Sequence, residues 1–142
     1  MKQVITLPPE LWQEMIDHAI SVPYVEVCGL LGARNNTLTS IYPVTNIDKG
    51  KKRRFLMSPQ EQIDAMRTMR ERSEVMAGIY HSHPDSVAVP SKTDRDLAAY
   101  PDVYYFIISL AGPVPDIRCY LLENQSFKEI TINVSSASTS SA

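Results

Sequence analysis

Two histidines and one carboxylate are spaced in the sequence like ligands of a metal ion. His81 and His83 belong to the segment His81-Ser82-His83-Pro84, and Asp94 follows. On a β-strand, residues i and i+2 project from the same face, so both imidazoles reach one point. Zinc accepts imidazole nitrogen and carboxylate oxygen, and a catalytic zinc usually has three protein ligands and one position for water. We therefore predict one zinc ion per chain, with Asp94 as the best placed third ligand.

The third ligand and the role of Asp94 both have alternatives. Asp85 and Asp96 are weaker candidates for the third ligand, because Asp85 is too close to the histidines in sequence and Asp96 points elsewhere around its helix. A histidine pair at a strand end also occurs without any metal. Ser91-x-x-Asp94 is in addition an N-terminal capping pattern, in which Asp94 only faces the helix dipole. Capping and metal binding are compatible, since a cap places Ser91 close to the metal.

A zinc-dependent hydrolase also needs a general base, and Glu26 is the candidate. It lies in an otherwise apolar run, residues 25–32, where a carboxylate is costly unless a cation is near. The alternative is a solvent-facing glutamate that pairs with a basic side chain such as Arg34. Five further glutamates are predicted on helix surfaces, where a carboxylate is well solvated: Glu10, Glu14, Glu61, Glu71 and Glu74.

Length and composition restrict the class of protein. The chain has 142 residues, with 44% apolar and 21% charged residues and a net charge of -2, which is typical of one globular domain. This balance argues against nucleic acid as the main partner, because phosphate binding needs a basic excess. No apolar run is long enough for a signal peptide or a membrane span, so we expect a cytoplasmic protein without a membrane partner. Cys28 and Cys119 are interpreted as buried free thiols.

Periodicity and turn residues predict a mixed α/β or α+β layer fold in residues 1–134. Residues 135–142 contain only Ser, Thr and Ala and are predicted to be a disordered tail. We expect helices at residues 9–20, 59–72 and 92–100. The expected strands are residues 3–7, 25–33, 38–44, 54–57, 75–82, 103–110, 117–122 and 127–134.

The complete motif resembles that of the JAMM (MPN+) zinc metalloproteases. It consists of Glu26 in the run E-V-C-G-L-L-G, then His81-x-His83-Pro84, then Ser91-x-x-Asp94. The resemblance implies a JAMM/cytidine-deaminase-like mixed sheet flanked by helices. It also implies roles by position: His81, His83 and Asp94 as zinc ligands, Glu26 as general acid/base, and Ser91 as the group that stabilises the oxyanion.

The substrate follows from the resemblance alone. The segment 45–59 is short, as in the compact bacterial and archaeal members. These members imply a zinc-dependent peptidase or isopeptidase that acts at the C-terminal tail of a small ubiquitin-like (β-grasp) sulfur-carrier protein ending in Gly-Gly. The alternatives are a RadC-like protein, a phage-tail-associated JAMM peptidase, or a non-catalytic JAMM-fold interaction module. Cys28 is not needed as a nucleophile in this chemistry.

One strongly basic segment lies outside the metal motif. Residues 49–54, which we call the basic loop, contain five cations: Lys49, Lys51, Lys52, Arg53 and Arg54. The loop is either simply solvated or a docking patch for an acidic partner.

Overall fold

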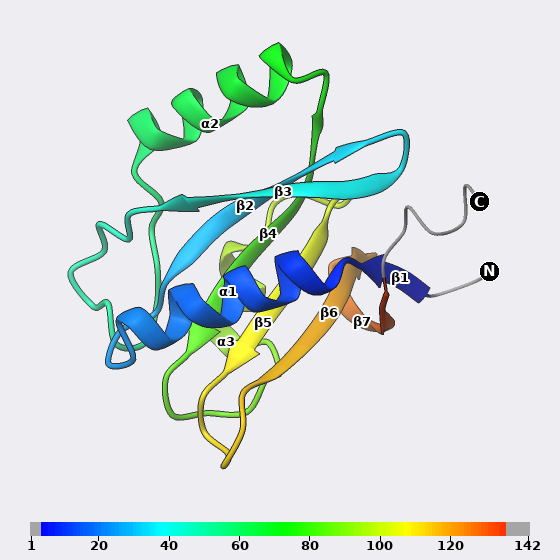
Figure 1. Cartoon of the computed structure of the whole chain (residues 1–142). Coiled ribbons are helices and arrows are strands. Elements are labelled where there is room, and N and C mark those ends of the chain that lie inside the picture. The colour runs from blue at the N-terminus through cyan, green and yellow to red at the C-terminus, as the bar shows by residue number, and fades with distance from the viewer. Residues whose placement is uncertain (1–3, 136–142) are drawn as a thin grey trace.

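A computed structural model describes residues 4–135, and it contains one mixed sheet of seven strands and three helices in that range. The strand order is β1-β7-β6-β5-β4-β2-β3. Figure 1 shows the long α1 crossing the sheet. The elements are β1 (Val4–Leu7), α1 (Pro9–Ser21), β2 (Cys28–Arg34), β3 (Thr37–Val44), α2 (Pro59–Glu71), β4 (Val75–His83), α3 (Lys92–Leu97), β5 (Tyr104–Ser109), β6 (Asp116–Glu123) and β7 (Ser126–Val134).

The two faces of the sheet carry separate apolar cores, because alternate residues of a strand point to opposite sides. Tyr80 and Phe106 pack on the face covered by α1. Ile79 and Ile107 point the other way and share a core with Ala65 and Met69 of α2. Strand β5 is buried on both sides, as its continuous apolar run predicts. His81 and His83 continue the alternation of Ile79, so they lie on the α2 side.

The pairing of β4 with β5 positions the candidate site. These strands are parallel, with His81 opposite Ile107 and His83 opposite Ser109. Parallel neighbours need a crossover connection, and here the segment between them carries α3. The loop that leaves the C-terminal end of β4 therefore brings α3 and Asp94 back toward the two histidines.

The predicted elements are confirmed with small shifts of their ends, with two corrections. Residues 54–57 do not form a strand, and only an isolated bridge joins Asn46 to Met57. Helix α3 ends at Leu97 instead of residue 100, because Ala98 is already extended and Pro101 follows shortly after.

One glutamate is also placed differently from the prediction. Glu74 is not on a helix surface. It lies in the short connection from α2 to β4 and is buried, with 6% of its surface exposed. The predicted tail lies outside the described residues, apart from Ser135. Within residues 4–135, the helices lack the length and apolar character needed to span a bilayer.

Candidate metal centre

Three ligand atoms from β4 and α3 converge at the C-terminal end of β4. His81 Nε2 and His83 Nε2 are 3.2 Å apart, and Asp94 Oδ2 lies 3.1 Å from the first and 3.0 Å from the second. Both histidines are buried, because the strand places them on the face covered by α2 and α3. The structure therefore brings together the three residues that the sequence predicted as ligands.

The hydrogen bonds around His83 leave its Nε2 available for a metal. Its Nδ1 lies 2.7 Å from the Val87 carbonyl oxygen, which can only accept, so Nδ1 carries the proton. A neutral His83 then presents the lone pair of Nε2 to the centre of the cluster, beside the Asp94 carboxylate. Three electron-rich atoms at this spacing repel one another unless they share a cation, which is either a metal ion or a proton that a histidine Nε2 donates to Asp94. His81 is held in place by stacking on Phe55, with ring centroids 4.6 Å apart.

The spacing fits a tetrahedral ion. With metal–ligand distances of about 2.0–2.1 Å, two ligands of a tetrahedral zinc are about 3.3 Å apart. The three distances of 3.0–3.2 Å in this cluster are close to that value. The donor set of two imidazoles and one carboxylate is also one that zinc accepts at catalytic sites.

The charges of the cluster are set by mutual contacts. Burial alone would raise the pKa of Asp94, but hydrogen bonds with His81 and His83 hold that pKa far below its usual range. Burial lowers the pKa of His81, whereas for His83 the contacts with Asp94 and Val87 outweigh burial and raise it. Asp94 is therefore ionised, as a ligand must be.

Ser91 forms the cap that the sequence pattern suggests. Its Oγ accepts a hydrogen bond from the Asp94 backbone N–H at 3.0 Å, and Asp94 Oδ2 accepts one from the Ser91 N–H at 2.9 Å. This capping box fixes the same carboxylate oxygen that faces the histidines. Because the Ser91 oxygen only accepts in the cap, its hydroxyl hydrogen is still available for a ligand.

Glu26 lies beside the cluster with one oxygen unsatisfied. Only 3% of the Glu26 surface is exposed. One of its carboxylate oxygens and a ring nitrogen each of His81 and His83 all lie within 4.8 Å of one another. Oε1 is buried without a hydrogen-bond partner among the described residues. Burial, followed by the negative charge of Asp94, raises the pKa of Glu26 to about 8. The alternative pairing with Arg34 is wrong, because Arg34 instead donates to the Arg72 carbonyl.

Sequence reasoning missed Asn46, which organises the loop beside Glu26. Its Nδ2 donates to the carbonyl oxygens of Glu26 and Arg54 at 2.9 and 3.1 Å. Its Oδ1 accepts from the backbone N–H groups of Asp48 and Leu56. The available signal was an asparagine two residues after the predicted strand 38–44, since asparagine side chains often bond to the backbone of turns. Asn46 is itself buried, so it acts as the core of the loop.

The remaining candidates lie away from the centre. Asp96 is exposed and pairs with Lys92 at 2.7 Å, and Asp85 is exposed as well. Both cysteines are free and buried, as predicted. Burial raises the pKa of Cys28 to about 12, so it stays a thiol and is unsuited to act as a nucleophile.

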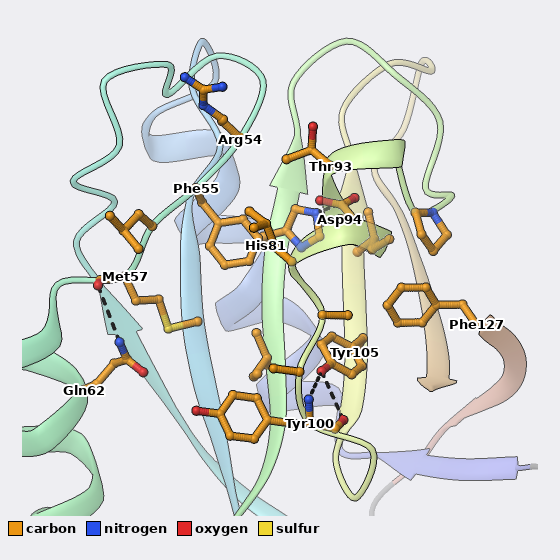
Figure 2. Close-up of a pocket in the computed structure, with 17 residues that line it drawn as sticks. Arg54, Phe55, Met57, Gln62, His81, Thr93, Asp94, Tyr100, Tyr105 and Phe127 are labelled. Carbon is orange, nitrogen blue, oxygen red and sulfur yellow. Dashed lines mark hydrogen bonds and ion pairs between the residues drawn. The ribbon is translucent and has the colours of Figure 1, made fainter. Parts of the chain in front are cut away.

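An apolar cavity of about 260 Å³ opens next to the cluster. Figure 2 shows His81 and Asp94 at its upper end, Phe55 and Met57 along one wall, and Phe127 on the opposite side. The cavity is hollowed mainly between the segment 54–57 and the region around α3. A segment of extended polypeptide that enters it reaches the metal ligands directly.

Comparisons with known proteins identify the family. A profile of the family described as prokaryotic homologs of the JAB domain matches residues 8–123. The chain belongs to this family. The chain is 33% identical to a desampylase of Haloferax volcanii over 79% of this chain and 80% of the relative. It is 31% identical to a CysO-cysteine peptidase of Mycobacterium bovis, over 92% of this chain and 91% of the relative.

Solved structures show the same fold. A solution structure of a Desulfitobacterium hafniense protein has a TM-score of 0.81 and 38% identity, covering 92% of each chain. A JAB1/MPN domain protein of Archaeoglobus fulgidus has a TM-score of 0.60 at 17% identity, covering 96% of this chain and 98% of its own. The predicted JAMM fold is confirmed. This member of the JAB family is a JAMM-type hydrolase, and its family is metal-dependent.

Proposed function

We propose that the chain is a zinc-dependent peptidase or isopeptidase that hydrolyses an amide bond at the C-terminal tail of a small ubiquitin-like sulfur-carrier protein. The tail would end in Gly-Gly before the scissile bond. Two relatives named as a desampylase and a CysO-cysteine peptidase, both matched over most of their length, support this substrate class. One zinc ion per chain would be held by His81, His83 and Asp94.

A single observation carries the proposal. Three ligand atoms lie 3.0–3.2 Å apart, and a buried carboxylate with an unsatisfied oxygen stands next to them. A structural zinc site would be closed by a fourth protein ligand, whereas this arrangement leaves room for water. The free Oε1 of Glu26 is suited to accept a proton. These features favour hydrolysis over a purely structural metal.

Zinc, when bound, supplies a Lewis acid that polarises the scissile carbonyl and acidifies water. Glu26 accepts a proton from the attacking water as the new carbon–oxygen bond forms. It then returns that proton to the nitrogen as the carbon–nitrogen bond breaks, so that the amine leaves neutral. A nearby cation lowers the pKa of Glu26 and favours the ionised form that the first step needs.

Ser91 is positioned by its cap for a second contact. The capping box holds the serine backbone against the Asp94 carboxylate, and the hydroxyl hydrogen is not used in the cap. We assign this hydrogen to the substrate carbonyl oxygen, whose negative charge grows during attack. A preorganised donor of this kind contributes about 10²–10³ in rate.

The deciding experiment is direct. The zinc-loaded protein is incubated with candidate β-grasp carriers that bear C-terminal extensions after Gly-Gly, and the products are read by mass spectrometry. We expect cleavage directly after Gly-Gly, and no cleavage by the His81→Ala/His83→Ala variant. Cleavage at the same rate by that variant, or cleavage within the folded part of the carrier only, contradicts the proposal.

A further inference from the structure

A second hollow of about 580 Å³ borders the metal centre, and its lining is basic. Five cations of the basic loop line it, together with Val25, Gly50 and Thr93. Figure 2 shows Arg54 and Thr93 above His81 and Asp94, and both residues line this hollow. The same two residues also line the apolar cavity, so the two hollows meet at Arg54 and Thr93, and Thr93 is the chain neighbour of Asp94.

The positive charge of this hollow is largely uncompensated. Arg54 pairs with Asp48 at 2.9 Å, but within residues 4–135 the other four cations of the basic loop have no carboxylate partner. All five side chains are exposed at the rim. Clustered like charges repel one another, and a bound anion relieves that repulsion.

The basic loop is hydrogen-bonded to the backbone of Glu26. The Glu26 backbone N–H donates to the Lys51 carbonyl oxygen at 2.6 Å, and Asn46 joins the carbonyl oxygens of Glu26 and Arg54. On the opposite wall, Thr93 directly precedes Asp94. The cations are therefore joined to Glu26 through the backbone and share a hollow with the residue before Asp94, so they do not lie on a remote surface.

We propose that this hollow binds the free carboxylate of the amino acid that the reaction releases. The inference rests on the proposed function. A bond cleaved at the metal places the carrier tail on one side and the leaving amine on the other. The apolar cavity suits an extended tail, and the basic hollow suits an anion. In a released α-amino acid the carboxylate is attached to the carbon next to the leaving nitrogen, so it reaches cations at the rim of the site.

The preferred substrate is then a carrier extended by a single amino acid with a free C-terminus. A conjugate through a lysine side chain offers no carboxylate at this position, so the chain would process it less efficiently. The competing use of the basic loop is contact with an acidic surface on the folded part of the carrier. That contact would favour both kinds of conjugate equally, so the preference between them distinguishes the two uses.

The activity test uses one carrier with three extensions after Gly-Gly: alanine, alanine amide, and an isopeptide to the side chain of Nα-acetyl-lysine amide. The alanine and alanine amide extensions differ only in the carboxylate. We expect kcat/KM to be about tenfold higher for the free carboxylate at low salt, the size of one charge-assisted hydrogen bond. The preference shrinks as salt is added, because exposed charges are screened.

The variant Lys51→Gln/Lys52→Gln/Arg53→Gln removes three cations from the hollow and keeps the backbone contact to Glu26. In this variant the ratio of kcat/KM for the free carboxylate to kcat/KM for the amide should fall from about ten to about one. The matched control, Arg67→Gln/Arg70→Gln/Lys128→Gln, removes three exposed cations outside both hollows and should keep the preference.

A binding measurement gives a readout without turnover. Calorimetry on zinc-loaded Glu26→Gln protein compares the Kd of the same carrier with the alanine and the alanine amide extension. We expect tighter binding of the free carboxylate by about tenfold, and equal binding after the three substitutions in the basic loop.

The outcomes separate this inference from the proposed function. Equal kcat/KM and Kd for alanine and alanine amide in the wild-type protein overturn the carboxylate site, even though cleavage itself upholds the peptidase. An equal loss on both extensions in the basic-loop variant assigns the cations to the carrier surface and also overturns it. Absence of any cleavage by the zinc-loaded wild-type protein counts against the proposed function instead.

Discussion

Glu26 and Glu74 are both buried carboxylates, but their surroundings are opposite. The oxygens of Glu74 accept hydrogen bonds from the hydroxyl groups of Thr39, Ser40 and Tyr42. Burial would raise the pKa of Glu74, but these hydrogen bonds lower it. Glu26 has an oxygen without any partner among the described residues, and its pKa is raised to about 8.

The difference supports a structural role for Glu74 and the proposed proton-transfer role for Glu26. Glu74 follows α2 and fastens its C-terminal end to β3 through three side chains, so its oxygens are fully used. Glu26 is held mainly by its backbone, which contacts Lys51 and Asn46. A carboxylate that is fixed through its backbone keeps its oxygens free to exchange a proton. Burial alone therefore does not separate the two carboxylates, whereas the unsatisfied buried oxygen of Glu26 does.

The largest effect is expected for Glu26→Gln, which keeps the shape of the side chain but removes the proton acceptor. Turnover of a carrier conjugate should fall by about 10²–10⁴, with zinc content and stability nearly unchanged. Steady-state kinetics and metal analysis measure both. Glu10→Gln, on the exposed side of α1, is the control with the same chemical change. Wild-type turnover in Glu26→Gln would show that Glu26 does not transfer the proton.

The second largest effect is expected for the stabilisation of the folded protein by bound zinc. Saturating zinc at about 100 times its Kd stabilises the folded protein by about 2.7 kcal/mol. Thermal unfolding with and without zinc should show this gain in the wild-type protein, in Glu26→Gln and in Glu74→Gln. The His81→Ala/His83→Ala variant should lose it. A gain that persists in the double histidine variant would place the metal elsewhere.

The variant Glu74→Gln should show the reverse pattern of Glu26→Gln. The free energy of unfolding should fall by about 1–3 kcal/mol, because the charge is lost and an NH2 donor replaces one of the two oxygens that accept from the three hydroxyl groups. Turnover per folded molecule should stay at the wild-type value. Urea unfolding followed by circular dichroism, together with kinetics at low temperature, tests both statements. A large loss of turnover with intact stability would make Glu74 a second functional carboxylate.

The smallest effect concerns pH. Because the pKa of Glu74 is lowered on folding, its contribution to stability is present above pH 4.5 and is lost as the pH falls through the folded-state value. The stability difference between the wild-type protein and Glu74→Gln should therefore shrink on acidification below pH 4.5. Urea unfolding at several pH values measures this difference. A difference that grows at acidic pH would show that the carboxylate is protonated in the folded protein.

Much of the site was predictable because it depends on local geometry. The strand period of two places His81 and His83 together, and the capping pattern places Asp94 at the start of α3. Both rules act over a few residues, so no knowledge of the tertiary structure was needed. The roles of these residues rest on the resemblance and remain predictions.

Features that depend on distant contacts were not predictable. Glu74 follows a helical pattern, and only the fold brings Tyr42 and its neighbours onto that carboxylate. Residues 54–57 have the composition of a strand, but the Leu56 backbone N–H donates to the Asn46 side chain instead of to a neighbouring strand. Only an isolated bridge between Asn46 and Met57 is formed. The basic hollow likewise depends on α3, which brings Thr93 opposite the basic loop.

The pairing of β1 with β7 sets an order for folding during synthesis. Val4–Leu7 leaves the ribosome early, yet its parallel neighbours in the sheet are residues 131–134. Contacts between segments this far apart in the chain form late, because closing so long a loop costs entropy. The first strand of the nascent chain must therefore wait, unpaired, until almost the whole domain has been translated. His81, His83 and Asp94 all precede β5, so the proposed metal centre can assemble before the sheet is closed at this edge.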